Sequence, residues 1–186
     1  MRASLSAILL AILAVPSLHA QNSTPPTPIL ARDVDSRPLP PVTQAALSPA
    51  MRKAVAALFD PELPPGELKI YRIPIAPHDH KLYFVEQRGP HACAGNGPNC
   101  PQSVLDETAS GVRTVVDGGG VGISVVRRPA LAMPDIAAFE QEGHFATSTT
   151  VYRFDGKAWH TYLCKLVSPI GSDPTPRIVA DQPCPF

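Results

Sequence analysis

The segment VYRFDGKAWHTYLCK, residues 151–165, constrains the fold more than any other part of the sequence. Asp155-Gly156 lies at its centre, and these two residue types tolerate the positive φ that a tight hairpin turn requires. Apolar or aromatic and polar side chains alternate on both sides of this pair, and strand side chains point alternately to opposite faces. The segment is therefore predicted to form a β-hairpin whose two arms each have one buried face.

Four cysteines, Cys93, Cys100, Cys164 and Cys184, indicate an oxidising compartment. Four thiols allow three pairings. We favour Cys93–Cys100 and Cys164–Cys184, because each pair closes a short local loop rich in turn residues. The alternative is a four-cysteine zinc site, but six and nineteen residues separate the members of these pairs, which departs from the usual zinc-ligand spacing.

The first twenty residues have the pattern of a signal peptide, which suggests export. Arg2 provides the positive start, Ala7–Val15 is apolar, and Ala20 is a small residue at the expected cleavage site. The apolar run is shorter than a membrane-spanning helix, and no second long run follows. The mature chain is therefore predicted to be periplasmic or secreted and not membrane-spanning. An uncleaved N-terminal anchor is the alternative.

Charge excludes nucleic acid as a partner. The chain has 16 basic and 16 acidic residues, and loss of Arg2 with the signal leaves 15 against 16. Such a balance provides no basic field for nucleic acid or anionic lipid. Residues 21–47 are rich in proline and without period, which predicts a flexible leader. A single domain is expected over residues 48–186.

The pattern within that domain predicts an α+β fold. Ser48-Pro49 is a typical helix start, and an apolar stripe follows over residues 49–59. Lys81–Gln87 is apolar on both faces, which indicates a central strand. Other strands are expected at Leu68–Ile75, Ser103–Asp106, Val112–Val116, Val121–Val126 and Ile136–Phe139, with Gly118–Gly120 as a flexible hairpin connection and Ser168–Pro185 as a loop. Together these predict one N-terminal helix on a single, mostly antiparallel meander sheet, stapled by disulfides.

His78-Asp79-His80 is the most suggestive local motif. In an extended segment, His78 and His80 would lie on the same side and could bind one zinc or copper ion. The alternative is a polar turn between two strands. Two ligands are too few for a tight site unless the fold supplies more.

Other candidate chemistry is weaker. No G-x-S-x-G nucleophile motif occurs and no cofactor is predicted. Carboxylates that could contribute an acid/base pair are Glu86, Asp106, Asp135, Glu140 and Glu142. Tyr152, Trp159 and Tyr162 could form an aromatic surface for a glycan, or the core of a small sheet instead.

Three motifs also resemble a group of small exported bacterial proteins of uncharacterised function. The motifs are Cys93 to Asn99-Cys100, Met133-Pro134-Asp135-Ile136, and Tyr152-Arg153-Phe154-Asp155-Gly156 followed by Cys164. The shared features are a cysteine-bounded Gly/Asn loop, a Pro-Asp strand start and a Tyr-x-Phe-Asp-Gly hairpin, over roughly residues 81–164. This resemblance implies a periplasmic or secreted domain and carries over no active site.

The sequence thus predicts a non-catalytic binding or interaction module of the bacterial envelope, whose partner is an envelope protein or a glycan. One alternative is an envelope hydrolase or metal-dependent enzyme using His78, His80 and nearby carboxylates. The other is a metal-sequestering protein using the same histidines.

Overall fold

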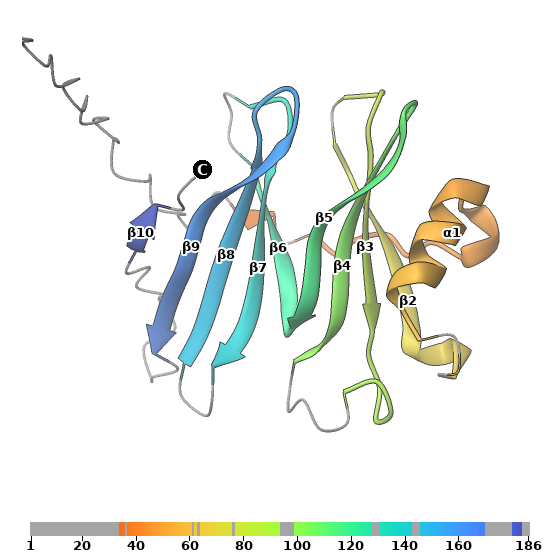
Figure 1. Cartoon of the computed structure of the whole chain (residues 1–186), viewed down its shortest axis with the longest axis horizontal. Coiled ribbons are helices and arrows are strands. Elements are labelled where there is room, and N and C mark those ends of the chain that lie inside the picture. Colours follow the sequence, from red (N-terminus) through yellow and green to blue (C-terminus); the bar gives the residue numbers. More distant parts are fainter. Residues whose placement is uncertain are drawn as a thin grey trace, which may run out of the picture.

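The computed structural model describes residues 34–35, 37–60, 62, 64–75, 77–93, 99–127, 131–142, 146–169 and 180–183. Within these ranges the chain contains one α-helix and two antiparallel sheets, so the fold is mostly β (Figure 1). The helix is α1 (Pro49–Leu58). The strands are β1 (Val34–Asp35), β2 (Leu68–Ile73), β3 (Lys81–Gln87), β4 (Cys100–Thr108), β5 (Gly111–Gly120), β6 (Gly122–Val126), β7 (Asp135–Glu142), β8 (Ala146–Phe154), β9 (Trp159–Pro169) and β10 (Ala180–Pro183).

The antiparallel meander is confirmed, but it forms two sheets rather than one. One sheet has the order β2-β3-β4-β5 and the other the order β1-β6-β7-β8-β9-β10. The chain passes from the first to the second between β5 and β6, and the two sheets lie next to each other in Figure 1. The amide of Val121 at this crossing donates to the carbonyl of Phe139 in β7, at 2.9 Å.

The prediction of a hairpin connection at Gly118–Gly120 is wrong. These glycines are the last residues of β5 and pair with Gln102, Pro101 and Cys100 of β4. A Cβ on Gly120 would lie 1.9 Å from Nε2 of Gln102 and 2.6 Å from the Phe139 carbonyl oxygen. At Gly120 the missing side chain therefore permits a close approach of two segments and does not mark a flexible turn.

The predicted helix is confirmed at Pro49–Leu58. Its N-cap is Ser48, whose Oγ accepts a hydrogen bond of 3.0 Å from the Met51 amide. Among the described residues, β1 and a short 3-10 helix (Gln44–Ala46) precede it. The buried residues of the helix pack on one face of the four-stranded sheet, against Ile70, Tyr83, Val85 and Leu105.

The other face of that sheet shares a core with the six-stranded sheet. The core residues include Ile73, Leu82, Phe84 and Val104 from the first sheet and Val125, Ile136 and Ala138 from the second. β3 lies between β2 and β4 and is buried on both faces, as its continuous apolar pattern predicts.

Part of the predicted leader, residues 21–47, contacts both sheets. Val34–Asp35 pairs with β6. The amide of Val42 donates to Ile70 and the Pro40 carbonyl accepts from Arg72, so this segment covers the open edge of β2. An edge strand has unpaired backbone groups, and the proline-rich segment satisfies part of them. The predicted signal peptide, residues 1–20, lies outside the described residues.

The Cys93–Cys100 disulfide is confirmed, with its Cα atoms 4.7 Å apart. Cys164 belongs to β9, where its backbone lies opposite Gln182. The side chain of Cys164 and the whole of Cys184 lie outside the described residues, so their pairing stays a prediction. The predicted loop at Ser168–Pro185 is wrong in part, because β9 extends to Pro169 and β10 occupies residues 180–183.

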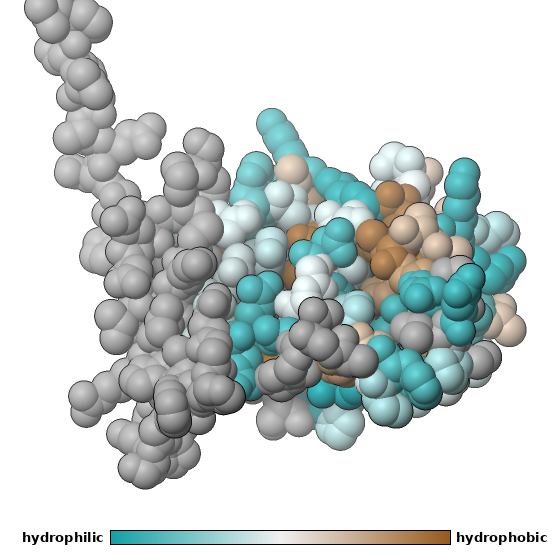
Figure 2. Space-filling model, turned by 60° about the horizontal axis from the view of Figure 1, so that its bottom comes forward, coloured by the Kyte–Doolittle hydropathy of each residue, from teal (hydrophilic) through white to brown (hydrophobic). Residues whose placement is uncertain are grey.

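The end of the molecule at the bottom of Figure 1 has a mostly hydrophilic surface where it is described. Figure 2 brings this end forward and shows a limited apolar patch on the side that carries α1. Among the described residues, Leu131 is the one large apolar residue that is exposed to solvent. Leu131 lines a pocket formed by the loops.

Candidate functional site

A pocket of about 460 Å³ lies among three connections that follow or precede strands. We call it the loop-end pocket. The connection before β3 contributes Pro77, Asp79 and His80, and the segment before β7 contributes Leu131, Ala132 and Met133. The β8–β9 hairpin contributes Arg153, Phe154, Asp155 and Gly156. The pocket therefore combines segments that are distant in the sequence.

A buried carboxylate holds one of the pocket residues, His80. Nδ1 of His80 lies 2.9 Å from each oxygen of Asp106, and the Asp106 side chain is 0% exposed. Trp159 donates its indole Nε1–H to Oδ2 of Asp106 at 3.0 Å, and Nε of Arg113 lies 3.6 Å from the same oxygen. Three donor side chains thus surround this carboxylate, which compensates for its removal from water.

Sheet register explains why these residues meet. Asp106 lies opposite Leu82 of β3 and opposite Arg113 of β5. Like Val104 two residues earlier, it faces the core between the sheets, because strand side chains alternate. His80 precedes Leu82 by two residues and so reaches Asp106 from the start of β3. Its ring also contacts Phe154 edge-on, with 4.9 Å between centroids.

A second buried carboxylate holds Arg153. Nε and Nη2 of Arg153 donate to Oδ1 and Oδ2 of Asp135 at 2.8 and 2.7 Å, which is a bidentate pair. The hydrogen bonds that Arg153 donates to Asp135 raise the pKa of Arg153 above its usual value. The guanidinium also lies 3.6 Å from the centroid of the Tyr162 ring. Arg153 is therefore fixed in place at the pocket.

The hairpin turn is stabilised by Asp155. Its Oδ1 accepts from the amides of Lys157 and Ala158, each at 2.8 Å, and Nε2 of His160 lies 2.9 Å from its Oδ2. The hydrogen bonds from the backbone amides of Ala158, which has the largest effect, and Lys157 lower the pKa of Asp155 to about 2. Gly156 has a φ of +98°, the left-handed conformation that glycine favours. The predicted hairpin is confirmed, with residues 155–158 as its connection.

The histidine motif is divided by the fold. His80 is buried and bound to Asp106, whereas His78 is exposed. The structure does not place the two imidazoles in one environment, because the segment turns before β3. Within the described ranges, no three His, Cys, Asp or Glu side chains form a group that could hold a metal ion. The geometry therefore lends no support to the predicted metal site.

The structure places the predicted aromatic residues Tyr152, Trp159 and Tyr162 in two different apolar clusters. Tyr152 and Trp159 pack against the core between the sheets, while Tyr162 packs with Val126, Ala137 and Val151 in a separate apolar cluster. Side chains of consecutive strand residues point to opposite faces of the sheet, so Tyr152 and Trp159 pack on one face and Tyr162 on the other. This outcome agrees with the alternative that they contribute to the packing of a small sheet.

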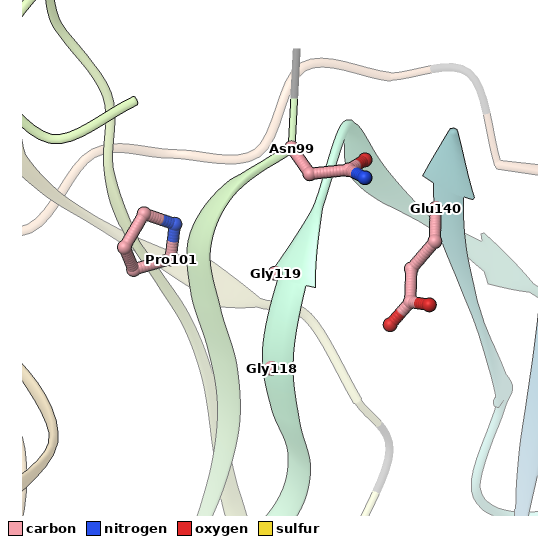
Figure 3. Close-up of a pocket in the computed structure, with 5 residues that line it drawn as sticks. All are labelled: Asn99, Pro101, Gly118, Gly119 and Glu140. Carbon is pink, nitrogen blue, oxygen red and sulfur yellow. The ribbon is translucent and has the colours of Figure 1, made fainter. Parts of the chain in front are cut away.

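A smaller pocket of about 380 Å³ lies where the sheets meet. Its lining residues are Asn99, Pro101, Gly118, Gly119 and Glu140. Figure 3 shows the Glu140 carboxylate directed from β7 toward the strand that carries the two glycines. Asn99 exchanges two hydrogen bonds with the backbone of Gln141, at 3.0 and 2.8 Å. The Asn99 amide is thus engaged in joining the two sheets, and Glu140 is the charged group among the described residues of this lining.

Sequence reasoning identified His80, Asp106 and Asp135 individually but missed Arg153, Leu131 and Met133 as pocket residues. The only feature of the sequence that pointed to Arg153 was its charge within a predicted strand of alternating side chains. Its partner could be found only from the register, in which Ile136 lies opposite Tyr152.

Comparison with known proteins gives no family for this chain. No protein-family model, no curated protein and no solved structure matches it. The resemblance to small exported bacterial proteins therefore stays a prediction. Across the described residues, no helix is both long enough and apolar enough to cross a membrane.

Proposed function

We propose that this protein is an exported, non-catalytic binding module and that its ligand occupies the loop-end pocket. The observation that carries this proposal is a pocket of about 460 Å³ whose polar groups are held by buried partners. Pockets for small molecules generally measure roughly 300–1,000 Å³ and combine apolar walls with a few placed polar groups. A pre-arranged site loses less conformational entropy when a ligand binds.

The apolar and polar parts of the pocket are both available to a ligand. Leu131 is 37% exposed, and Met133 and Phe154 continue the apolar wall. The polar wall contains His80, Arg153 and the carboxylates of Asp79 and Asp155. An amphipathic small molecule, or the end of one side chain of a partner, fits such a combination.

Two observations support export to the periplasm or the medium. Residues 1–20 have the pattern of a signal peptide. The Cys93–Cys100 disulfide agrees with an oxidising compartment.

The second candidate function is hydrolysis with His80 as general base, and the Asp106–His80 pair favours it. Asp106 orients the imidazole through Nδ1, as the carboxylate does in hydrolytic triads, and leaves Nε2 for proton transfer. The described part of the pocket lining contains no serine, threonine or cysteine, so water is the nucleophile in this candidate mechanism. Among the described lining residues, His80 alone has an arrangement suited to this reaction, so we rank binding first.

Ligand capture with a matched pair of variants tests the proposal. Small molecules extracted from bacterial envelopes are fractionated and titrated into the purified, disulfide-bonded chain. The readout is the fluorescence of Trp159, the single tryptophan of the sequence. Trp159 bonds to the same carboxylate as His80, and its ring centroid lies 5.6 Å from that of Phe154. The variant Ala132→Phe narrows the pocket, and Ala57→Phe makes the same change at an exposed site on α1.

A fraction that binds saturably at one site, and that is rejected by A132F but retained by A57F, would support the proposal. Binding that A132F leaves unchanged, or the absence of any saturable fraction, would overturn it. If mass spectrometry finds the bound compound cleaved, the general-base candidate replaces the binding module.

A further inference from the structure

We infer that the loop-end pocket binds a primary ammonium group carried on an apolar stem. This inference rests on the proposed function, because it names the chemistry of the ligand at the same site. Two acceptors, an excess of negative charge and an apolar wall lead to it.

The first acceptor is Nε2 of His80. Since the carboxylate of Asp106 lies 2.9 Å from Nδ1 and is otherwise surrounded by donors, the hydrogen-bond network assigns the ring hydrogen to Nδ1. In that tautomer Nε2 has a lone pair and no hydrogen. The side chain is 10% exposed and lines the pocket, and within the described part of the chain no group donates to Nε2.

The second acceptor is the carboxylate of Asp79. Its Oδ2 lies 3.9 Å from Nε2 of His80, and its side chain is 82% exposed and lines the same pocket. The distance of 3.9 Å between Asp79 Oδ2 and His80 Nε2 leaves room for one ligand nitrogen that lies about 2.9 Å from both atoms. An ammonium has three hydrogens and can donate to both acceptors at once, whereas a hydroxyl has only one hydrogen to give.

The charges around the pocket favour a cation over an anion. Arg153 is the permanently charged cation in the described part of the lining, and its Nε and Nη2 already donate to the carboxylate of Asp135. Asp155 stays ionised in neutral solution because its pKa is about 2, although His160 lies beside it. Among the described residues, no lysine or arginine pairs with Asp79. Electrostatic complementarity therefore selects against a carboxylate ligand.

The apolar wall accommodates the stem of the ligand. Leu131 and Met133 come from one side of the pocket and Phe154 from another. A chain of about four to six methylene groups offers apolar area to this wall, and removal of that area from water favours binding. Both a free alkylamine and a lysine side chain have this composition.

The test compares ligands of nearly equal size that differ in one end group. Hexylammonium, hexan-1-ol and hexanoate are titrated at neutral pH into the full chain with its disulfides intact, with Trp159 fluorescence as the readout. Nα-acetyl-lysine methylamide forms a fourth arm and reports whether the ammonium can be carried by a peptide. The variant Asp79→Asn removes one acceptor charge, and Glu62→Gln, at an exposed site, is its charge-matched control.

We expect hexylammonium to bind about tenfold more tightly than hexan-1-ol, because a hydrogen bond from a charged donor is stronger than one from a neutral donor. D79N should weaken hexylammonium about threefold, the effect of one exposed charge, and should leave hexan-1-ol unchanged. E62Q should alter neither. Tighter binding of the lysine derivative than of hexylammonium would identify a peptide as the carrier, and the reverse would identify a free amine.

Failure of the inference and failure of the proposed function give different results. Equal binding of all three hexyl compounds, or a preference for hexanoate, at a site blocked by A132F would overturn the ammonium inference and retain the pocket as a ligand site. Absence of saturable binding by all four probes would overturn the ammonium inference, and it would overturn the proposed function only if no envelope fraction binds saturably either.

Discussion

Asp106 has no direct part in the pocket lining, yet it determines how His80 is presented there. Its carboxylate is fully buried and receives hydrogen bonds from His80, 26 residues earlier, and Trp159, 53 residues later. A buried charge with several donors is stabilised as a unit, so removing one member leaves the others without compensation. Asp79, on the other side of the same imidazole, is exposed and has no comparable structural role.

We expect Asp106→Ala to lower the free energy of unfolding by about 3 kcal/mol, because it leaves two buried donors unpaired. Asp79→Ala should change that free energy by less than about 0.5 kcal/mol, as is usual for exposed positions. Urea unfolding followed by circular dichroism measures both values. Equal effects of the two variants would contradict the structural role assigned to Asp106.

The Asp155 carboxylate should titrate with a pKa of about 2, below its usual value of 3.8, because the amides of Ala158 and Lys157 stabilise its charged form. A group whose pKa is lower in the folded state stabilises the fold fully above its unfolded pKa. That contribution is lost as the pH falls through the folded pKa. The hairpin should therefore lose this support between about pH 4 and pH 2. Carboxyl carbon NMR shifts would show it, and a midpoint near 3.8 would refute the assigned hydrogen bonds.

The two sheets separate at the end of strand β5. β5 pairs with β4 along its whole length and ends in three glycines, beyond which Val121 bonds to β7. Glycine is normally unfavourable within a strand, since it has no side chain to pack and loses more entropy. The close approach of Gln102 and the Phe139 carbonyl explains why this cost is tolerated at Gly120.

Two adjacent glycines provide a controlled test of this explanation. Gly120→Ala should destabilise the fold by about 1–3 kcal/mol, because its Cβ would lie 2.6 Å from a backbone oxygen. Gly119→Ala places its Cβ 3.6 Å from Asn99, an ordinary contact, and should change stability by less than about 1 kcal/mol. Thermal or urea unfolding measures both. A larger loss for G119A than for G120A would show that chain flexibility, rather than close approach, is what the glycines provide.

The whole molecule is held together by a core that both sheets share and by the helix on the far face of the smaller sheet. Covalent support comes from the Cys93–Cys100 bond, which joins the loop after β3 to the first residue of β4. Asn99, beside that cysteine, links the same loop to β7. The disulfide therefore stabilises a loop that also connects the two sheets.

Replacing both Cys93 and Cys100 by serine should lower the free energy of unfolding by about 2–3 kcal/mol, the loop-closure entropy for a loop of this length. Glu62→Gln is again a suitable exposed control. Unfolding curves in oxidising buffer measure the difference. A double variant as stable as the parent chain would show that the bond contributes nothing to the fold.

The predicted Cys164–Cys184 bond has its own test. Non-reducing peptide mapping should recover one peptide that joins the two cysteines, and Cys164→Ser should lower the unfolding free energy by about 3 kcal/mol. An unchanged melting temperature for C164S under oxidising conditions would exclude this pairing.

The sequence by itself determined the local elements whose signals are contained in a few neighbouring residues. Ser48-Pro49 and the apolar stripe after it predicted the helix, Asp155-Gly156 predicted the hairpin, and the cysteine-bounded loop predicted the Cys93–Cys100 bond. Each of these depends on backbone propensity or short loop closure, which act over short distances along the chain.

Only the tertiary structure decided the division into two sheets, the role of Gly120 and the composition of the loop-end pocket. His80 meets Asp106 and not His78, and Arg153 meets Asp135, because strand register brings them together. A shift of one residue in register would send every side chain of a strand to the other face. Register is set by the packing of the whole core, so no local pattern of the sequence contains it.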